Sequence, residues 1–562
     1  MPRLIIGLDF GTTFSGISWT LESSRDIEVI STWPKSGNKT PGKVPTTLAY
    51  QENRTLWGYQ TASLPPDTVF HGFKLLLDST QHDQYQPAIR SQSLLKKYDK
   101  TAVDVAGDYL KCLVAHSKTV LQRRLGAAFE CMELHYVLTV PAVWSDKAKD
   151  ATRVAGVKAG IPVSDITMIS EPDSAAMYCL DTLQPKAIKD LISYRVSKLY
   201  PLVLKEETQG TAEGGICGSA CLDSRFDELL QGHLGDTYAE IPSISLDTAR
   251  SYWDNDIKPS FGTRLYDDFD DNDGSDITAK DDGEDDDGDS ATVVPYIVPL
   301  PGVKDDQAIF LKNNFLYLDW NQIQEIFDPV VSDVEKLVRG QVESVAKNGK
   351  TAKAILLVGG FGSSEYLFRR LKKAFPNMLV MQPPNAWTAV VRGAVSHGVG
   401  SNPVSERIAR RHYGIRVSIQ YDPSRHHEST RYWDSLREEW IVNDAMEWYI
   451  QKGSAISEDS PISLAWSSDF AVDRKSKRTD LSLYVDHQDD APGFLSSNTF
   501  KVCTVNVDLG QIPSKLFEIR TNSKGKSYYI VKYDIRMTPK SASILFELVF
   551  NGATYGSLRA KY

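Results

Sequence analysis

The first residues that could do chemistry follow an apolar run at the start of the chain. Residues 4–8 are apolar, Asp9 ends the run, and residues 14–21 alternate in polarity, which predicts a β-hairpin. Glycine in the turn lets a ligand approach the backbone, and successive backbone N–H groups bind anions. Asp9 is placed to hold a hydrated cation beside phosphates, although an ordinary hairpin with a glycine turn has the same pattern. The candidate phosphate-binding residues are Gly11, Thr12 and Thr13.

Three other predicted strands also end in residues suited to binding. The apolar run Ile355–Val358 leads into Gly359, Gly360, Phe361 and Gly362, after which Ser363 or Ser364 can cap a helix. A second run, 138–144, precedes a helix that Ser145 can cap. A third run, 166–170, ends at Glu171. Strand, turn and helix units of this kind predict an α/β domain.

In this order and at these separations, the four motifs resemble those of the actin-like ATPase superfamily. Within it they look like the seventy-kilodalton heat-shock chaperone family, and in particular its divergent branch in filamentous fungi. The resemblance covers about the first 400 residues. It implies a two-lobed actin-like ATPase core, related to the ribonuclease H fold, followed here by a C-terminal β-rich domain.

The resemblance also implies ATP or ADP as ligand, with Mg²⁺ held through water by Asp9. Lys74 matches the lysine near the γ-phosphate, although a surface lysine would fit its context too, and Glu171 matches a carboxylate that holds metal-bound water. Of the family's second phosphate loop, only Asp190 has a match in this chain. The implied catalytic residues are Lys74, Glu171 and Asp190. The implied nucleotide-binding residues are Gly11, Thr12, Thr13, Gly214, Gly215, Lys258, Gly359, Gly360, Phe361 and Gly362.

The chain departs from the family pattern after residue 180. The family has a strand and a triple-glycine turn there, whereas residues 183–190 contain no glycine. Loss of one preorganised donor costs about 10²–10³ in rate, so loss of a loop predicts weak nucleotide binding and little or no hydrolysis. A skipped exon would leave the same gap. Gly214 and Gly215 match a glycine pair near the β-phosphate, but a plain loop before a helix is an equally simple reading.

Pattern changes along the chain predict its domains. We expect lobe I at 1–182 with 384–402 returning to it, lobe II at 183–383, and a β-rich domain at 403–562, where apolar and polar residues alternate. Residues 267–289 hold thirteen of the acidic residues and one lysine, which predicts a disordered insertion. In the helical stripe 320–345, Pro329 predicts a break.

Composition limits the classes of function. The net charge of −10 comes largely from the acidic insertion, so the rest is nearly neutral and suggests no nucleic-acid surface. The six scattered cysteines form no zinc pattern, and no apolar run could span a membrane, which together predict a cytoplasmic protein.

The favoured function is an ATP-binding, chaperone-like protein with an impaired nucleotide site. Its expected partners are an adenine nucleotide and, from the resemblance, unfolded polypeptide or a cochaperone. The alternatives are a non-hydrolysing scaffold or interaction module on the same fold and, more remotely, a small-molecule kinase of the superfamily. A kinase would need a base for its acceptor hydroxyl, and the sequence offers no candidate.

Overall fold

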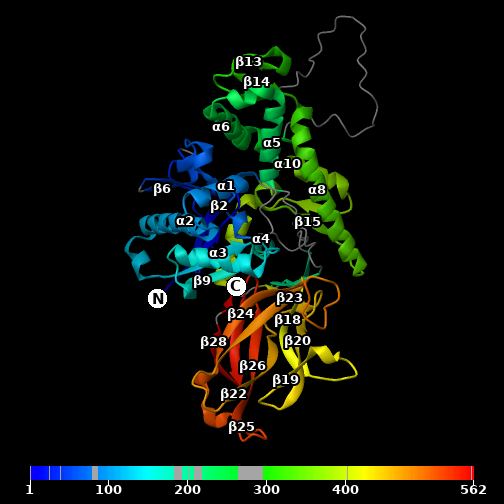
Figure 1. Ribbon diagram of the computed structural model, residues 1–562. Helices are drawn as coiled ribbons and strands as arrows, with labels where there is room; N and C mark the ends of the chain where they lie inside the picture. Colours follow the sequence, from blue (N-terminus) through cyan, green and yellow to red (C-terminus); the bar gives the residue numbers. More distant parts are fainter. Residues whose placement is uncertain are drawn as a thin grey trace, which may run out of the picture.

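The computed structural model describes residues 2–24, 26–37, 40–52, 54–78, 86–182, 193–199, 202–207, 218–263, 295–400, 403–558 and 560–562. Asp190, Gly214, Gly215 and the acidic insertion 267–289 lie outside these residues. The described chain mixes helices and strands up to about residue 400 and is rich in β-strands beyond it (Figure 1). This confirms the expected mixed α/β core and β-rich C-terminal region.

A six-stranded sheet organises the N-terminal part of the chain. Its central strand β1 pairs antiparallel with β2 and parallel with β8. Leu4, Ile6 and Leu8 of β1 belong to one hydrophobic core and Ile5 to another, so both faces of the sheet are buried. The order is β3-β2-β1-β8-β9, with β4 on β2. The strands are β1 (Arg3–Asp9), β2 (Phe14–Leu21), β3 (Glu28–Val29), β4 (Val44–Pro45), β8 (Glu133–Val140) and β9 (Ile166–Ser170).

Helices cover both faces of this sheet. Helices α2 and α3 pack on one face, and α4 and α11 pack together on the other. Ser145 caps α3 as expected, since its Oγ accepts a hydrogen bond from the Ala148 N–H. The helices are α1 (Gln86–Lys97), α2 (Ala102–Leu125), α3 (Asp146–Lys158), α4 (Glu171–Thr182) and α11 (Ala389–Val399). A small sheet beside them contains β5 (Thr47–Gln51), β6 (Arg54–Trp57) and β7 (Phe70–His71).

A separate hydrophobic core lies in the middle of the chain. Its longest helix, α8, contains Pro329, so the predicted break is wrong. Proline removes one backbone donor, but the stripe from Ile323 to Val345 stays buried on both sides of it. The helices are α5 (Ser219–Leu234), α6 (Ser243–Tyr252), α7 (Lys258–Ser260), α8 (Trp320–Lys347), α9 (Gly359–Gly362) and α10 (Glu365–Ala374).

The strands of this middle region fall into separate sheets within the described residues. The hairpin β10–β11 does not pair with the two parallel strands β15 and β16, and the strand next to β11 is instead β17 (Val404–Ile408). The three-stranded sheet β12-β14-β13 stands apart from both. The strands are β10 (Tyr194–Leu199), β11 (Leu202–Glu206), β12 (Tyr296–Pro299), β13 (Leu311–Lys312), β14 (Phe315–Leu318), β15 (Ala354–Leu356) and β16 (Leu379–Met381).

The C-terminal region consists of two antiparallel sheets that share one hydrophobic core. One sheet has the order β19-β20-β18-β23-β24-β29 and the other β22-β26-β27-β28, with β25 on β26. Strands β17 and β21 (Ala455–Ile456) belong instead to the sheet of β10 and β11. The strands of the two sheets are β18 (His412–Gln420), β19 (Arg431–Asp434), β20 (Glu439–Ile450), β22 (Ile462–Ala471), β23 (Arg478–Asp486), β24 (Thr499–Asp508), β25 (Glu518–Thr521), β26 (Ser527–Pro539), β27 (Ile544–Phe550), β28 (Ala553–Leu558) and β29 (Ala560–Lys561).

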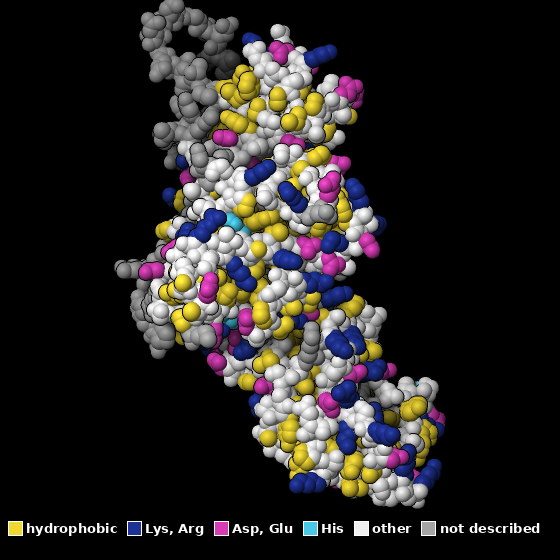
Figure 2. Space-filling view, turned by 90° about the vertical axis from the view of Figure 1, so that its left-hand side faces the viewer, with side chains coloured by type: hydrophobic (Ala, Val, Ile, Leu, Met, Phe, Trp, Pro, Cys, Tyr) yellow, Lys and Arg dark blue, Asp and Glu magenta, His cyan; other side chains and the backbone are white. Residues whose placement is uncertain are grey.

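The surface drawn in Figure 2 is mixed in charge. Basic and acidic side chains are interspersed over this face, without a broad area of one sign. In the described part of the chain, no helix is both long enough and apolar enough to cross a membrane.

The contact between α4 and α11 gives a test of the fold. A Cβ added to Gly393 would lie 1.6 Å from the Ser174 carbonyl oxygen, which is fixed backbone. We expect Gly393→Ala to force the two helices apart and to lower the free energy of unfolding by about 3 kcal/mol, the upper part of the range for overpacked cores. Urea unfolding followed by circular dichroism measures the change.

Gly340→Ala in α8 is the matched control. Nothing lies within 4 Å of a Cβ added at Gly340, so alanine should raise the free energy of unfolding by up to about 1 kcal/mol through its helix propensity. Equal stabilities for the two variants would contradict the close contact of α4 with α11.

Candidate functional site

The turn that follows β1 is shaped by close backbone contacts. A Cβ on Gly11 would come within 2.1 Å of the Phe14 carbonyl oxygen, so a larger residue does not fit without a shift. The Thr13 carbonyl accepts a hydrogen bond from the Thr46 N–H at 2.8 Å, which ties the turn to the segment before β5. Thr12 lies between them and is half-buried. The three predicted phosphate-binding residues therefore form one fixed turn.

Asp9, at the end of β1, is buried and fully engaged. Lys43 Nζ lies 2.6 Å from its Oδ2, and the Thr139 hydroxyl donates to its Oδ1 at 2.8 Å. Burial acts to raise the pKa of Asp9, but the charges of Lys43 and Lys74, together with these hydrogen bonds, outweigh it and leave the pKa below the usual value. Asp9 is thus an ionised carboxylate whose two oxygens both have partners.

Lys74 and Glu171 meet although 97 residues separate them. Their side chains form an ion pair, with Nζ 2.6 Å from Oε1. The ammonium group of Lys74 lies 5.8 Å from the centre of the Phe10 ring and 5.3 Å from that of Trp144, and Lys74 is only 2% exposed. Glu171 is less buried because it begins α4, directly after β9. The surface-lysine reading of Lys74 is therefore wrong.

The ion pairs Asp9–Lys43 and Lys74–Glu171 form one group of side chains, which we call the four-charge cluster. It consists of two ammonium groups and two carboxylates, and the Lys74 charge lies close enough to act on Asp9. The cluster stands at the ends of β1 and β9, the two strands that flank β8 in one sheet. Its members are Asp9, Lys43, Lys74 and Glu171.

The second glycine loop is also pinned in place. It turns at Gly359, whose φ of +83° is a glycine conformation, and Gly362 has no room for a Cβ because the Leu357 backbone is 2.9 Å away. Ser364, not Ser363, caps α10 by accepting from the Leu367 N–H. Gln382 Nε2 donates to the backbone carbonyls of the loop at 3.0 and 3.1 Å.

Trp387 lies between the two glycine-containing turns. Its ring packs edge-on against Phe14, with centroids 5.9 Å apart, and a Cβ on Gly360 would lie 3.8 Å from the same ring. The hairpin turn and the Gly359–Gly362 loop thus come to one tryptophan from distant parts of the sequence. Phe361 points elsewhere, since it lines an apolar cavity of about 190 Å³ with residues of β15 and α8.

Lys258 lies in the middle hydrophobic region and is already paired. Its ammonium group is 2.6 Å from an oxygen of Asp223 and also contacts Asp254. Burial raises the pKa of Asp223 to about 6 against the opposing pull of Lys258. The described residues place Lys258 with α5 and the helical turn at 253–257, not with the four-charge cluster. Asp190, Gly214 and Gly215 lie outside the described residues.

Sequence reasoning missed several residues of the site. Lys43 and Thr139 hold Asp9, and Trp387 joins the two turns. Thr139 lies near the end of β8, inside a run that the sequence had singled out, whereas Trp387 lies in the short helical turn 386–388 of the returning segment 384–402. Lys43 directly precedes β4, and nothing in the local sequence indicates that its side chain reaches Asp9.

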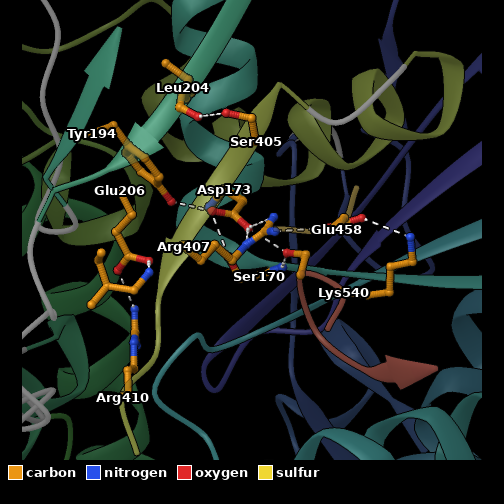
Figure 3. A network of polar contacts seen from close by, with 12 residues as sticks. Ser170, Asp173, Tyr194, Leu204, Glu206, Ser405, Arg407, Arg410, Glu458 and Lys540 are labelled. Carbon is orange, nitrogen blue, oxygen red and sulfur yellow. Dashed lines mark hydrogen bonds and ion pairs between the residues drawn. The ribbon is translucent and has the colours of Figure 1, made fainter. Parts of the chain in front are cut away.

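A second ionic network joins the first turn of α4 to the C-terminal region (Figure 3). Asp173 is buried and accepts hydrogen bonds from Arg407 at 2.9 and 3.2 Å and from Ser541 at 2.6 Å. Tyr194 of β10 donates to the same carboxylate. Burial acts to raise the pKa of Asp173, but these partners outweigh it and leave the pKa below the usual value. Arg407 also pairs with Glu458 at 2.9 Å.

The basic segment 407–411 takes part in this network and is held by it. The Ile408 N–H and the Arg410 guanidinium both donate to Glu206 of β11. Burial dominates at Glu206 and raises its pKa. Arg407 is buried against Asp173, two residues after Glu171 of the four-charge cluster. The first turn of α4 therefore carries one carboxylate for each of the two ionic groups.

The mixed α/β core, with charged side chains gathered at the strand ends of one sheet and a glycine loop nearby, is consistent with the actin-like ATPase superfamily. Sequence comparisons support this class. The chain is 21% identical over 551 aligned residues to heat shock 70 kDa protein 12A of Mus musculus, a match covering 79% of this chain and 75% of that protein.

Two further relatives match a shorter part of the chain. The chaperone protein HscA homolog of Acinetobacter baumannii is 27% identical over 194 residues, covering 32% of this chain and 28% of that protein. A ribosome-associated molecular chaperone of Nakaseomyces delphensis is 28% identical over 199 residues, covering 31% of this chain and 28% of that protein. Residues 407–561 match a family model described as a domain of unknown function, DUF8568. The assignment of the chain to the family's branch in filamentous fungi stays a prediction.

The Asp173 network gives a test with a defined pH dependence. Asp173→Asn removes one of the two carboxylates that pair with the buried Arg407, and we expect a loss of about 3 kcal/mol in the free energy of unfolding at pH 7, the lower end of the range for breaking a buried pair. Because the folded-state pKa of Asp173 is depressed, the wild-type advantage is complete above its ordinary pKa of about 3.9 and is lost as the pH falls through the folded value. Urea unfolding at pH 7 and at decreasing acid pH measures both effects.

Asp333→Asn is the control, because Asp333 forms an exposed ion pair with Lys336 on α8. Its effect should stay within about 0.5 kcal/mol at each pH. An Asp173→Asn protein as stable as wild type at neutral pH would show that the network contributes nothing to folding.

Proposed function

We propose that this protein is a chaperone-like protein that binds an adenine nucleotide between the hairpin turn and the Gly359–Gly362 loop. The four-charge cluster carries the proposal. Segments far apart in sequence bring two buried ammonium groups to the ends of β1 and β9, beside the tight turn of glycine and threonine. Such an arrangement neutralises phosphate charge in a site that excludes water.

Each part of the site has a proposed role. Backbone N–H groups and hydroxyls of the hairpin turn would hold the phosphates, with Lys74 near the terminal one and Glu171 keeping Lys74 in place. The Gly359–Gly362 loop would take the adenosine side, since it stands across Trp387 from the turn. Lys258, Gly214 and Gly215 stay proposed contacts, and Lys258 would have to exchange a carboxylate for the ligand.

The proposed domains follow the same division as the sequence pattern. Residues 1–182 with 384–402 would form one lobe and 183–383 the other, with the nucleotide between them. The return of α11 onto β1, β8 and α4 supports the first assignment. The separation of β10–β11 from β15–β16 supports the view that the second lobe lacks the strand that precedes the second phosphate loop.

We propose that hydrolysis is at or near background. The glycine loop that would clamp the β- and γ-phosphates has no counterpart in residues 183–190, so the transition state gains little that the bound ground state lacks. The role left to the nucleotide is then to stabilise one arrangement of the lobes. No contact in the described residues favours the small-molecule kinase.

A second candidate function is that of an interaction module, favoured by the C-terminal sheets. Strand β19 is an edge strand, and Tyr432 and Trp433 on it, with Trp440 on β20, are 41–64% exposed. An exposed edge with aromatic side chains is suited to adding an extended polypeptide as a further strand. We propose unfolded polypeptide or a cochaperone segment as the partner of this edge.

Calorimetry tests the nucleotide proposal directly. We expect the full chain to bind ATP or ADP in the micromolar to millimolar range, roughly −8 to −4 kcal/mol, with single-turnover phosphate release no faster than a blank. Nanomolar affinity, or turnover that mutation abolishes, would mean that another segment replaces the missing loop.

Lys74→Ala tests the role of the cluster. Removing the buried ammonium group takes one of two positive charges from the phosphates, and we expect affinity to fall by about ten-fold or more, which is at least 1.4 kcal/mol. Lys336→Ala, at an exposed site on α8, should bind as wild type does. Thermal melting of both variants checks the fold. Unchanged affinity in a folded Lys74→Ala protein would remove Lys74 from the site.

A further inference from the structure

The Lys43 side chain reaches Asp9 across Gly16 of the β1–β2 hairpin, where there is no side chain in its way. Its backbone precedes β4, which pairs with the start of β2, and the Tyr59 hydroxyl donates to the Lys43 carbonyl at 3.2 Å. Gly16 stands opposite Asp9 in the β1–β2 ladder, and a Cβ on Gly16 would lie 3.3 Å from Lys43 Cγ. The lysine stem therefore lies over a glycine and brings the ammonium group to the end of β1.

This ammonium group takes the Asp9 oxygen that would otherwise accept a hydrogen bond from metal-bound water. A carboxylate orients hydrated Mg²⁺ by accepting hydrogen bonds from the metal-bound water. Here Lys43 takes Oδ2 of Asp9 and Thr139 takes Oδ1, and Asp9 and Lys43 are only 4% and 6% exposed. Replacing Lys43 by a hydrated cation would strand a buried ammonium group without its partner, which is strongly unfavourable.

The described residues around the cluster offer the metal no other set of ligands. Glu171, the other carboxylate of the cluster, already pairs with Lys74. Across the described residues, no three His, Cys, Asp or Glu side chains gather in a way that could hold a metal ion. The donor set at the end of β1 therefore does not fit Mg²⁺, although it supplies the positive charge that phosphates require.

We infer that Lys43 is the resident cation of this site and takes the place of Mg²⁺, so that the chain binds metal-free adenine nucleotide. This rests on the proposed function. Lys43 and Lys74 would together neutralise the phosphate oxygens, while the hairpin turn supplies neutral donors. An ammonium group fixed to Asp9 does not position an attacking water as a hydrated metal ion does, which gives a second reason, independent of the missing loop, for slow hydrolysis.

The experiment compares nucleotide affinity with and without the metal. Calorimetry with ATP and with ADP is done on the full wild-type chain in EDTA and in excess Mg²⁺, so the central result requires no mutant. We expect the two affinities to agree within about three-fold. An affinity that rises about ten-fold or more on adding Mg²⁺ would overturn the inference but leave the proposed function standing.

Two variants then assign the effect to Lys43. Lys43→Met keeps the length of the stem but removes the charge, and we expect affinity in EDTA to fall about ten-fold or more and to recover when Mg²⁺ is added, because Asp9 is released. Lys43→Arg keeps the charge and should bind nucleotide in EDTA better than Lys43→Met does. Lys336→Met, on the exposed face of α8, should match wild type in both buffers.

Other outcomes overturn different parts of the proposal. A folded Lys43→Met protein with wild-type affinity in EDTA would make Lys43 a structural ion-pair partner only. No binding of either nucleotide to wild type in either buffer, with a normal melting transition, would overturn the proposed function itself.

Discussion

Buried and half-buried carboxylates at the ends of β1 and β9 impose the main constraint on this structure. Asp9, Glu171 and Asp173 lie where β1 ends and where β9 passes into α4, and burying an ionised carboxylate is costly unless a cation and hydrogen bonds accompany it. Each has one: Lys43, Lys74 and Arg407, at sequence separations of 34, 97 and 234 residues. The segments that carry these basic residues are thereby drawn to one edge of the N-terminal sheet.

The pairing explains why the cluster is suited to a ligand and not simply to stability. A buried ion pair contributes little net stability compared with apolar packing, because desolvation offsets the attraction. Two such pairs beside a tight glycine-containing turn are therefore poorly accounted for as folding devices alone. They hold two ammonium groups in fixed orientations in a site with little water. An ammonium group in such a site attracts a phosphate group more strongly than it does in bulk water.

Local patterns in the sequence predict the strand ends well and their partners poorly. The apolar run before Asp9 and the glycines at 359–362 are local signals, and the structure places each at a strand end. Lys43 carries no such signal, because its contact depends on β4 lying against β2 and on the absent side chain of Gly16. Pro329 is the opposite case, because it is a local signal that gave a wrong prediction. Its tendency to break a helix is outweighed by the burial of apolar residues along the whole of α8.

The same constraint makes the C-terminal region part of the core architecture. Strand β17 pairs with β11 on one side and β21 on the other, and its Arg407 reaches Asp173. The connection is therefore a shared strand with a buried ion pair, in contrast to a solvated linker. Because Glu171 and Asp173 lie on one helical turn, α4 cannot shift at its first turn without disturbing both Lys74 in the four-charge cluster and Arg407 beside the C-terminal sheets. A ligand that repositions Lys74 would act on both through this single turn.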